Sequence, residues 1–163
     1  MSQFDDKARM EEILSSESIG HLALTNEGEL YLVPLNFTYD TGRILFHCAL
    51  TGRKLDMIRA QPNVCFEVCR QEGPPVEHHG RKCDSPFVSV ICWGTARVID
   101  DLEERRELLQ AFELRYATPE KPRNATTLER AQGCGAVAIT VTRMTGRQAK
   151  SDHNARWEWS AED

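Results

Sequence analysis

The sequence contains no long apolar run and no excess of positive charge. Its apolar stretches fall short of the roughly 18 residues that a membrane-spanning helix needs, so we expect no membrane segment. The 20 basic residues are outnumbered by 25 acidic ones, and the net charge is −5 at pH 7. This balance argues against a nucleic-acid partner, because phosphate binding requires a concentrated positive field. The first residues are acidic rather than basic and then apolar, which predicts no secretory signal and a cytoplasmic location.

Motifs for nucleotide binding and acyl transfer are also lacking. The sequence has no Walker-type loop, no Gly-x-Ser-x-Gly segment and no Cys-x-x-Cys pair. In a reducing compartment its six cysteines are expected to be free thiols. A zinc-stabilised domain would have to recruit widely spaced ligands, namely Cys65, Cys69, His78, His79 and Cys83. Zinc sites usually build on a closer pair of ligands, and cysteine more often packs as a small apolar side chain, so we expect no metal site.

What is present is mostly alternation of apolar and polar residues with a period of two, which predicts β-strands. We expect strands at residues 19–25, 29–37, 43–49, 63–70, 87–99 and 137–141. The tight turns at 26–28 and 40–42 predict that the first three strands form an antiparallel meander. Pro34 lies inside the second strand and cannot donate a ladder hydrogen bond, so that strand is expected at an edge, at a bulge or where another group approaches the backbone.

Helical periodicity appears only between these strands and before them. We expect helices at residues 5–14, from a Thr51 cap to residue 60, from the capping box at residues 101–104 to before Pro119, and from an Asn124 cap to residue 132. Residues 71–86 are expected to be an irregular loop. The chain therefore predicts a single domain, residues 1–163, with a mainly β (α+β) fold: a small barrel of about six strands with peripheral helices.

Two adjacent cations begin the second predicted helix. Arg53 and Lys54 follow the Thr51–Gly52 turn, where the free N–H groups of a helix start attract anions. Positive side chains are mildly unfavourable at this end of a helix, and a bound phosphate would remove the conflict. Solvation of both side chains explains the pattern equally well.

Several segments, taken in order, resemble one known family. They are residues 33–37 (VPLNF), 44–49 (ILFHCA), 52–56 (GRKLD), and 87–96 (FVSVICWGTA) followed by 100–105 (DDLEER). This set is similar to the FMN-binding split-barrel superfamily, typified by pyridoxamine 5′-phosphate oxidase, and closest to its 5-nitroimidazole-resistance, nitroreductase-like branch. The likeness extends over about residues 5–145.

The resemblance implies a homodimer of six-stranded antiparallel split β-barrels that binds one FMN in each of two clefts at the subunit interface. Arg53 and Lys54 would hold the FMN phosphate, and Ser89 would reach the flavin. The remaining contacts implied for the ring and the ribityl chain are Val33, Pro34, Leu35, Asn36, His47, Cys48 and Ala49.

The chain also departs from the oxidase itself. Where that enzyme has basic residues on the flavin-facing strand, this sequence has residues 31–33 (YLV) and Asn36, and the arginine-bearing C-terminal strand has no clear counterpart. We therefore do not expect oxidation of pyridoxamine phosphate. Trp157 and Trp159 either close over a partner's flavin or anchor a C-terminal tail by aromatic packing.

His47 is the candidate catalytic residue. An imidazole with an ordinary pKa of about 6.5 could donate a proton to a reduced substrate or hold an anion beside the flavin. It could also be an axial haem ligand, since relatives of this fold bind haem, or a strand residue that only packs. The resemblance implies an FMN-dependent oxidoreductase that reduces a small electron-poor acceptor, a nitro compound or a quinone. The alternative is a non-catalytic carrier or sensor of flavin or haem.

Overall fold

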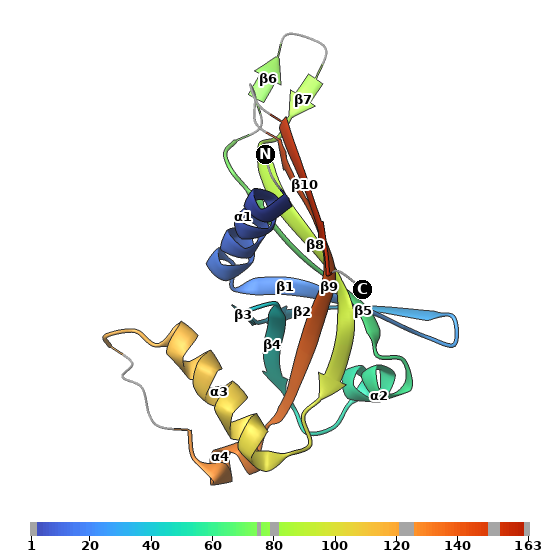
Figure 1. Cartoon of the computed structure of the whole chain (residues 1–163), viewed down its shortest axis with the longest axis vertical. Coiled ribbons are helices and arrows are strands. Elements are labelled where there is room, and N and C mark those ends of the chain that lie inside the picture. The colour runs from blue at the N-terminus through green and yellow to red at the C-terminus, as the bar shows by residue number, and fades with distance from the viewer. Residues whose placement is uncertain (1–2, 75, 79–81, 121–125, 150–153, 162–163) are drawn as a thin grey trace.

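The computed structural model describes residues 3–74, 76–78, 82–120, 126–149 and 154–161. Within them an eight-stranded sheet has the order β2-β1-β5-β8-β9-β4-β3, with β10 paired to β9, and a separate two-stranded sheet joins β6 to β7 (Figure 1). The strands are β1 (Ile19–Asn26), β2 (Glu29–Asn36), β3 (Thr38–Asp40), β4 (Arg43–Cys48), β5 (Asn63–Gln71), β6 (Val76–His78), β7 (Lys82–Asp84), β8 (Phe87–Val98), β9 (Gly135–Ala149) and β10 (Asn154–Ser160).

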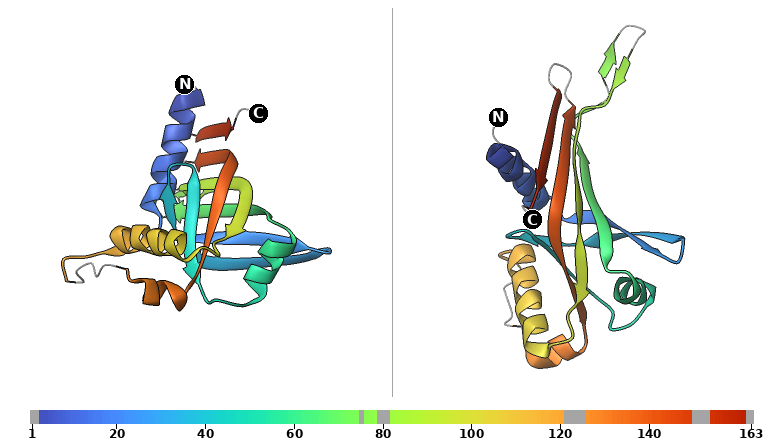
Figure 2. Two further views of the ribbon diagram at one scale, coloured as in Figure 1. Left: turned by 60° about the horizontal axis from the view of Figure 1, so that its bottom comes forward. Right: turned by 45° about the vertical axis from the view of Figure 1, so that its right-hand side comes forward.

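Every pairing is antiparallel, and the large sheet curls into a half-barrel flanked by helices (Figure 2). The predicted split barrel with peripheral helices is therefore confirmed. Six strands were expected, and the sheet has eight because the short β3 and the C-terminal β10 join it. Pro34 lies in β2 at one end of the strand order, which confirms its prediction as an edge strand.

Two predictions about the strands were wrong. β4 does not continue a meander from β2 but pairs with β3 and β9, because the turn at Thr41–Gly42 connects the inserted β3 to β4. Residues 71–86 are not wholly irregular, because β6 and β7 form a hairpin there. The C-terminal tail is a strand: β10 follows β9 in register, and its Trp157 is buried in the core while Trp159 packs against it.

Four helices flank the sheet: α1 (Gln3–Ser16), α2 (Arg53–Ala60), α3 (Leu102–Tyr116) and α4 (Leu128–Gln132). Asp101 caps α3 as predicted and accepts a hydrogen bond of 2.8 Å from the Glu104 amide. The predicted caps of the other two helices were wrong. α2 begins after Gly52, and α4 is capped by Thr127, while Asn124 falls outside the described residues. None of the described helices is both long and apolar enough to span a membrane.

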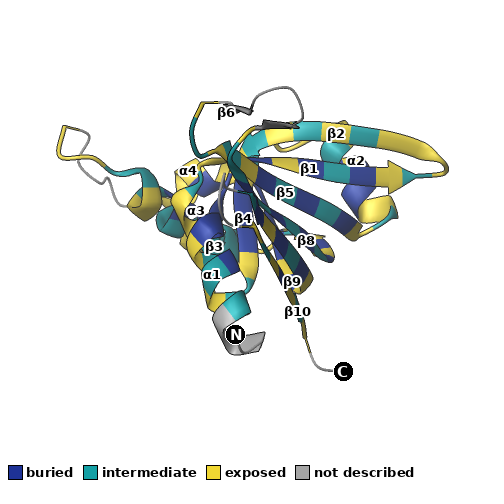
Figure 3. Cartoon of the chain, turned by 90° about the horizontal axis from the view of Figure 1, so that it is seen from above, coloured by how far each residue is buried: buried dark blue, intermediate teal, exposed yellow. Residues whose placement is uncertain are grey.

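The core fills the inside of the curled sheet beneath α1 and α2, and Figure 3 shows the alternation of buried and exposed residues along its strands. The rings of Phe37 and Phe66 meet edge to face with centroids 4.9 Å apart. A second, smaller cluster joins α3 to β4 and β9, and it consists of Leu45, Ile99, Leu108, Ala136 and Ala138.

β9 carries one extra residue relative to β8. Trp93 pairs with Arg143 and Gly94 with Val141, so Thr142 is the bulged residue, and its hydroxyl donates a 3.2 Å hydrogen bond to the Trp93 carbonyl. The bulge changes which residues of β9 face inward, because both Met144 and Val141 are buried. Bulges of this kind bend and twist a strand, as the curled sheet requires.

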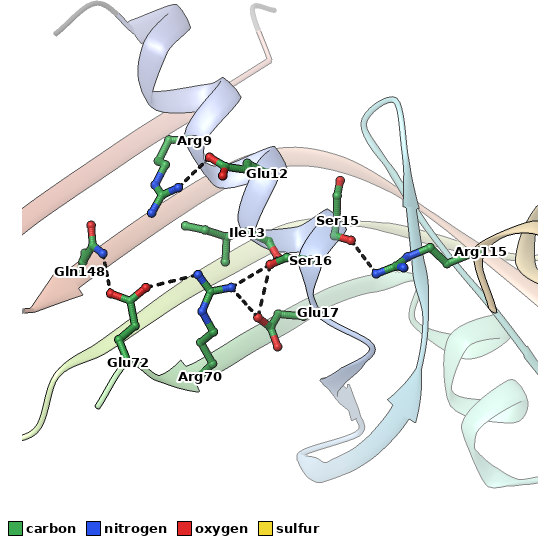
Figure 4. Close-up of polar contacts among 10 residues, drawn as sticks. All are labelled: Arg9, Glu12, Ile13, Ser15, Ser16, Glu17, Arg70, Glu72, Arg115 and Gln148. Atoms are coloured by element: carbon green, nitrogen blue, oxygen red, sulfur yellow. Dashed lines mark hydrogen bonds and ion pairs between the residues drawn. The ribbon is translucent and has the colours of Figure 1, made fainter. Parts of the chain in front are cut away.

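A polar network fixes α1 over one end of the barrel (Figure 4). The Arg70 guanidinium lies 2.8 Å from a Glu17 carboxylate oxygen and 3.2 Å from one of Glu72. The buried Gln148 amide in turn donates a 2.6 Å hydrogen bond to Glu72. These contacts connect the end of α1 to β5 and β9, so the helix is held by charge as well as by apolar packing.

Candidate functional site

The first two residues of α2 reach aromatic rings on β2 and β4, two strands that are far apart in the strand order. The guanidinium carbon of Arg53 is 4.8 Å from the centroid of the Tyr31 ring on β2. The Lys54 ammonium is 5.1 Å from the centroid of the Phe46 ring on β4. Arg53 also forms an ion pair with Glu29 at the start of β2. The two cations predicted to bind phosphate are therefore placed beside the two strands predicted to line the flavin.

The residues of β2 divide between two faces of the strand. Val33 and Leu35 are half-buried and pack against the core, whereas Pro34 and Asn36 are exposed on the opposite face. The Asn36 side-chain amide donates a 3.0 Å hydrogen bond to the Ser18 carbonyl, which ties this end of β2 to the start of β1. Among the described residues β2 pairs with β1 only, so one edge of its backbone is left for another partner.

His47 lies on the exposed side of β4, under α3. Its ring meets the Phe112 ring edge to face with centroids 4.5 Å apart, and its Nδ1 is 3.7 Å from the Cys134 sulfur. Burial lowers the pKa of His47 below its ordinary value, and the nearby Arg130 cation lowers it further. The imidazole is therefore held in its neutral form at neutral pH.

Cys48 points to the other face of β4 and packs against the core. Burial raises the pKa of its thiol, which keeps the thiol protonated, although the Lys54 cation opposes this effect. The Cys134 thiol lies 3.5 Å from the Cys48 carbonyl. The sequence analysis did not predict Cys134 as a site residue. Cys134 comes close to His47 and Cys48 because β4 pairs with β9, and no local sequence pattern indicates that pairing.

Close packing of the backbone also marks this region. Ala49 is exposed, and its carbonyl oxygen would lie 2.5 Å from a Cβ placed on Gly135. Only glycine therefore fits opposite Ala49 without a shift of the backbone.

Ser89, like Pro34 and Asn36, lies on the outer side of the sheet. It is on the outer face of β8, where its register partners are Cys69 on β5 and Arg147 on β9. Within a single protomer, Arg53 lies beside Tyr31 on β2 and Lys54 beside Phe46 on β4, whereas His47 faces Phe112 on the other side of β4.

The residues at the start of α2 suit the phosphate of FMN. Gly52 precedes the helix with a φ of 138°, a left-handed conformation that favours glycine, and it has no side chain to cap the helix N–H groups. Those groups and the Lys54 ammonium can therefore hold an anion. The half-buried apolar side chains of β2 next to them suit a flat ring. Glu29, the ion-pair partner of Arg53, would compete with a phosphate for the guanidinium.

The cysteines weighed as zinc ligands do not form such a site among the described residues. No group of three or more metal-ligating side chains occurs in the part of the chain that the structure describes. Cys65 and Cys69 share the outer face of β5, as the alternation predicted. The side chains of His78 and Cys83, and all of His79, lie outside the described residues.

Comparison with solved structures finds the same fold in other proteins. A candidate 5-nitroimidazole antibiotic resistance protein from Bacteroides thetaiotaomicron is 27% identical over 87% of this chain and 83% of its own, with a TM-score of 0.74. The flavocytochrome Anf3 from Azotobacter vinelandii is 16% identical over 96% of this chain and 79% of its own, with a TM-score of 0.75. A FAD and heme binding protein from Mycobacterium smegmatis is 17% identical over 96% of this chain and 74% of its own, with a TM-score of 0.73.

No curated protein matches the chain. A family model does match, and it extends from residue 6 to residue 148, which includes both strands of the candidate site and the start of α2. The match confirms the resemblance drawn from the ordered segments. The chain belongs to the pyridoxamine 5′-phosphate oxidase family.

Proposed function

We propose that this protein is an FMN-binding homodimer that reduces a small electron-poor acceptor, such as a nitro compound or a quinone. The observation that carries the proposal is the placement of Arg53 and Lys54 at the open start of α2, beside the apolar face of β2 and the end of β4. The likeness to a candidate 5-nitroimidazole resistance protein supports the class of acceptor.

The phosphate would be held by Lys54, by the first N–H groups of α2 and by Arg53. Arg53 presents a planar donor fork that suits a phosphate, and its stacking on Tyr31 already restricts the side chain. Glu29 holds the guanidinium from the other side, so phosphate binding would compete with an exposed ion pair. Such surface pairs contribute little, about 0–1 kcal/mol, so a doubly charged phosphate would displace the carboxylate.

The ring would lie along β2. Val33 and Leu35 offer half-buried apolar side chains, and the free edge of β2 offers backbone donors and acceptors. Backbone groups at a strand edge can pair with the polar rim of a flavin in the same way that they pair with another strand. FMN, when bound, supplies the hydride and electron transfer.

His47 would act beside the ring as a neutral imidazole. Because burial and the Arg130 cation lower the pKa of His47, it carries little positive charge at neutral pH. It is therefore better suited to donate or accept a hydrogen bond to an acceptor than to hold an anion by charge.

A second copy of the chain would cover the outer face of the sheet. Leu30 and Leu32 on β2 are 83% and 64% exposed, and Ile19 on the neighbouring β1 is 55% exposed. The register places Leu32 opposite Ala23 and Asn36 opposite Ile19, so these side chains share one face. Exposed apolar side chains gathered on one face are typical of an interface. Ser89 lies on the same outer face of the sheet, which is why a dimer would bring it to a partner's cofactor.

A non-catalytic carrier or sensor of flavin or haem is the second candidate. The observation that favours haem is the neutral, exposed imidazole of His47, which is the form that ligates iron. Two proteins of the same fold, a flavocytochrome and a FAD and heme binding protein, are consistent with this alternative. A cytoplasmic location stays a prediction.

The absorption spectrum of the purified protein tests the cofactor. Bands at about 370 and 450 nm would indicate bound oxidised flavin, and a Soret band at about 410 nm would indicate haem ligated by the protein. Oxidation of a nicotinamide cofactor in the presence of a nitroaromatic or a quinone then separates an enzyme from a carrier. A protein that neither carries nor takes up FMN, or that never turns over with either acceptor, would contradict the proposal.

A further inference from the structure

His47 and Cys134 form a side-chain pair whose hydrogen bonds decide what the imidazole can do. Cys134 lies between α4 and β9, and the ladder between β4 and β9 brings it beside His47. The Cys134 sulfur is 3.7 Å from Nδ1 of the imidazole and 3.5 Å from the Cys48 carbonyl oxygen. A thiol is both a weak donor and a weak acceptor, so it can bind the two groups at once.

The hydrogens of this pair follow from the number of donors. A thiol has a single S–H, and a backbone carbonyl oxygen can only accept a hydrogen bond. If the Cys134 thiol donated to His47, its contact with the Cys48 carbonyl would have no hydrogen. If the thiol donates to the carbonyl instead, its sulfur can accept from Nδ1–H, and both contacts are hydrogen bonds. The second arrangement requires that His47 carry its hydrogen at Nδ1.

The imidazole of His47 has one hydrogen to place, because burial and the Arg130 cation lower its pKa and keep it neutral. A hydrogen at Nδ1 therefore leaves a lone pair at Nε2, which has no hydrogen-bond partner among the described residues. The charged groups that act on this ring have other partners. Arg130 forms an ion pair with Glu113, and the Lys54 ammonium lies over the Phe46 ring. Cys134 is thus the contact that sets the position of the hydrogen.

Packing fixes both members of the pair. The Phe112 ring meets the His47 ring edge to face with centroids 4.5 Å apart, so the imidazole is held in its orientation. Cys134 is followed by Gly135, where β9 approaches β4 so closely that a Cβ would lie 2.5 Å from the Ala49 carbonyl oxygen. The contact is therefore held by the backbone on one side and by an aromatic ring on the other.

We propose that Cys134 is a positioning residue that holds His47 as the Nδ1–H tautomer, so that His47 meets its ligand with an unprotonated Nε2. Of the two roles left open for a neutral His47, donating and accepting a hydrogen bond, this tautomer leaves acceptance. The ligand would then be a reducible molecule that carries its own O–H or N–H, and His47 would orient this molecule without protonating it. The ligand class rests on the proposed function, whereas the tautomer does not.

Two-bond ¹H–¹⁵N correlation spectra of the ¹⁵N-labelled protein as purified test the tautomer at neutral pH. The protonated and the unprotonated ring nitrogens resonate in separate regions, and the signals lost in His47→Gln are those of His47. We expect the hydrogen at Nδ1 in the wild type. A hydrogen at Nε2 would overturn the proposal, even if no variant of Cys134 folds.

Three variants test the part that Cys134 takes. Cys134→Ala removes the acceptor of Nδ1–H and should lower the ratio of the Nδ1–H to the Nε2–H tautomer about two- to tenfold, the value of one ordinary hydrogen bond. Cys134→Ser keeps a group that both donates and accepts, so it should restore the wild-type ratio. Cys48→Ala is the matched control, because only the backbone carbonyl of Cys48 takes part. An unchanged ratio in Cys134→Ala would mean that the thiol only packs, and the proposal would fail.

Two probes test the ligand class in the protein saturated with FMN. Para-nitrobenzyl alcohol has a nitro group and an O–H, and para-nitrobenzyl methyl ether lacks the O–H. We expect the alcohol to shift the Nε2 resonance of His47 and the ether to leave it in place. Equal shifts with both probes, or no shift at millimolar concentration, would overturn the ligand class. A protein that takes up no FMN would contradict the proposed function, while the spectra of the protein as purified would still decide the tautomer.

Discussion

Arg53 stacks on Tyr31, with its guanidinium carbon 4.8 Å from the centroid of the ring. This contact joins the first turn of α2 to the edge strand β2, which are 22 residues apart in the sequence and would otherwise be independent surface elements. It holds a cation next to the strand that we propose to line a flavin. FMN affinity, the protonation of His47, dimer formation and the free energy of unfolding can each be measured.

Removal of both cations should weaken FMN binding. Arg53→Ala with Lys54→Ala deletes two charge-assisted contacts to a phosphate, each worth roughly 1.5–3 kcal/mol. Fluorescence titration of the apoprotein with FMN measures the loss. Arg59→Ala is the control, because Arg59 is at the other end of α2 and lies near Asp100. Unchanged FMN affinity in the double variant would place the phosphate elsewhere.

Removal of the Glu29 carboxylate, which competes with phosphate for Arg53, should not weaken FMN binding. Glu29→Gln frees the Arg53 guanidinium from its ion pair and leaves its stacking on Tyr31 intact. We expect FMN to bind as tightly as in the wild type or a few-fold more tightly, since exposed pairs are worth about 0–1 kcal/mol. The same titration measures it. Weaker binding would mean that the ion pair positions Arg53 for the phosphate instead of competing with it.

His47 should make stability depend on pH in a definite direction. Because the pKa of His47 is lowered in the folded state, the unfolded chain binds a proton more readily. The free energy of unfolding should therefore fall as pH falls through the ordinary histidine pKa of about 6.5 and level off below the lowered folded pKa. Denaturant unfolding across this pH range should show that the free energy of unfolding falls less steeply in His47→Gln than in the wild type. A steeper loss in the variant would contradict the lowered pKa.

His47→Ala separates the roles of the side chain. It should leave FMN affinity unchanged, because Arg53 and Lys54 hold the phosphate, but it should alter turnover or abolish haem binding. Flavin titration, the spectrum with added haem and steady-state rates measure the three outcomes. If none of them changes, His47 only packs against Phe112.

The exposed face of β1 and β2 should control dimer formation. Leu30→Glu with Leu32→Glu places two charges on the proposed dimer interface, where both side chains are now largely exposed. We expect a monomer by light scattering after size-exclusion chromatography, together with a loss of FMN. Leu114→Glu on α3 is the control, because this leucine is also exposed, at 43%, but lies on a helix away from that face. A double variant that remains dimeric would remove this face as the interface.

Gly94 should be intolerant of any side chain. A Cβ there would lie 2.2 Å from the Thr140 carbonyl oxygen, so Gly94→Ala forces β8 and β9 apart. We expect a loss of about 1–3 kcal/mol in the free energy of unfolding, measured by denaturant titration. Gly133→Ala is the control, since Gly133 follows α4 with a right-handed backbone conformation, and the nearest atom to a Cβ there would be an ordinary 3.7 Å away. Equal stability of the two variants would contradict the close packing at the bulge.

The sequence predicted those structural elements that depend on a single residue or on residues close to one another in the chain. Pro34 marked the edge strand because proline cannot donate to a ladder, and Asp101 marked the start of α3 because its carboxylate accepts from the Glu104 amide. Glu104 does not complete the predicted box, because its side chain pairs with Arg97 instead. Contacts between residues close in the sequence could thus be predicted, except where a residue from another element, here Arg97, bound the same side chain.

Pairing between distant strands could not be predicted in the same way. Nothing near His47 in the sequence indicates Cys134, which reaches it through the ladder between β4 and β9. The same holds for Arg147 and Arg156, whose opposition follows from the register of β9 and β10. Sequence patterns show which face a residue takes, but the register of distant strands depends on how the whole sheet closes.

The bulge at Thr142 also restricts how β9 can change in length. If that single residue were deleted, β9 would pair with β8 without interruption, Val141 and Met144 would still face the core, and Arg143 and Arg147 would still face outward, but the local bend would be lost. A one-residue deletion elsewhere inside β9 would instead exchange the two faces of the strand beyond it, because side chains alternate with a period of two. The bulge is therefore a position at which β9 can lose a residue and keep its inward and outward faces, while the sheet loses curvature there.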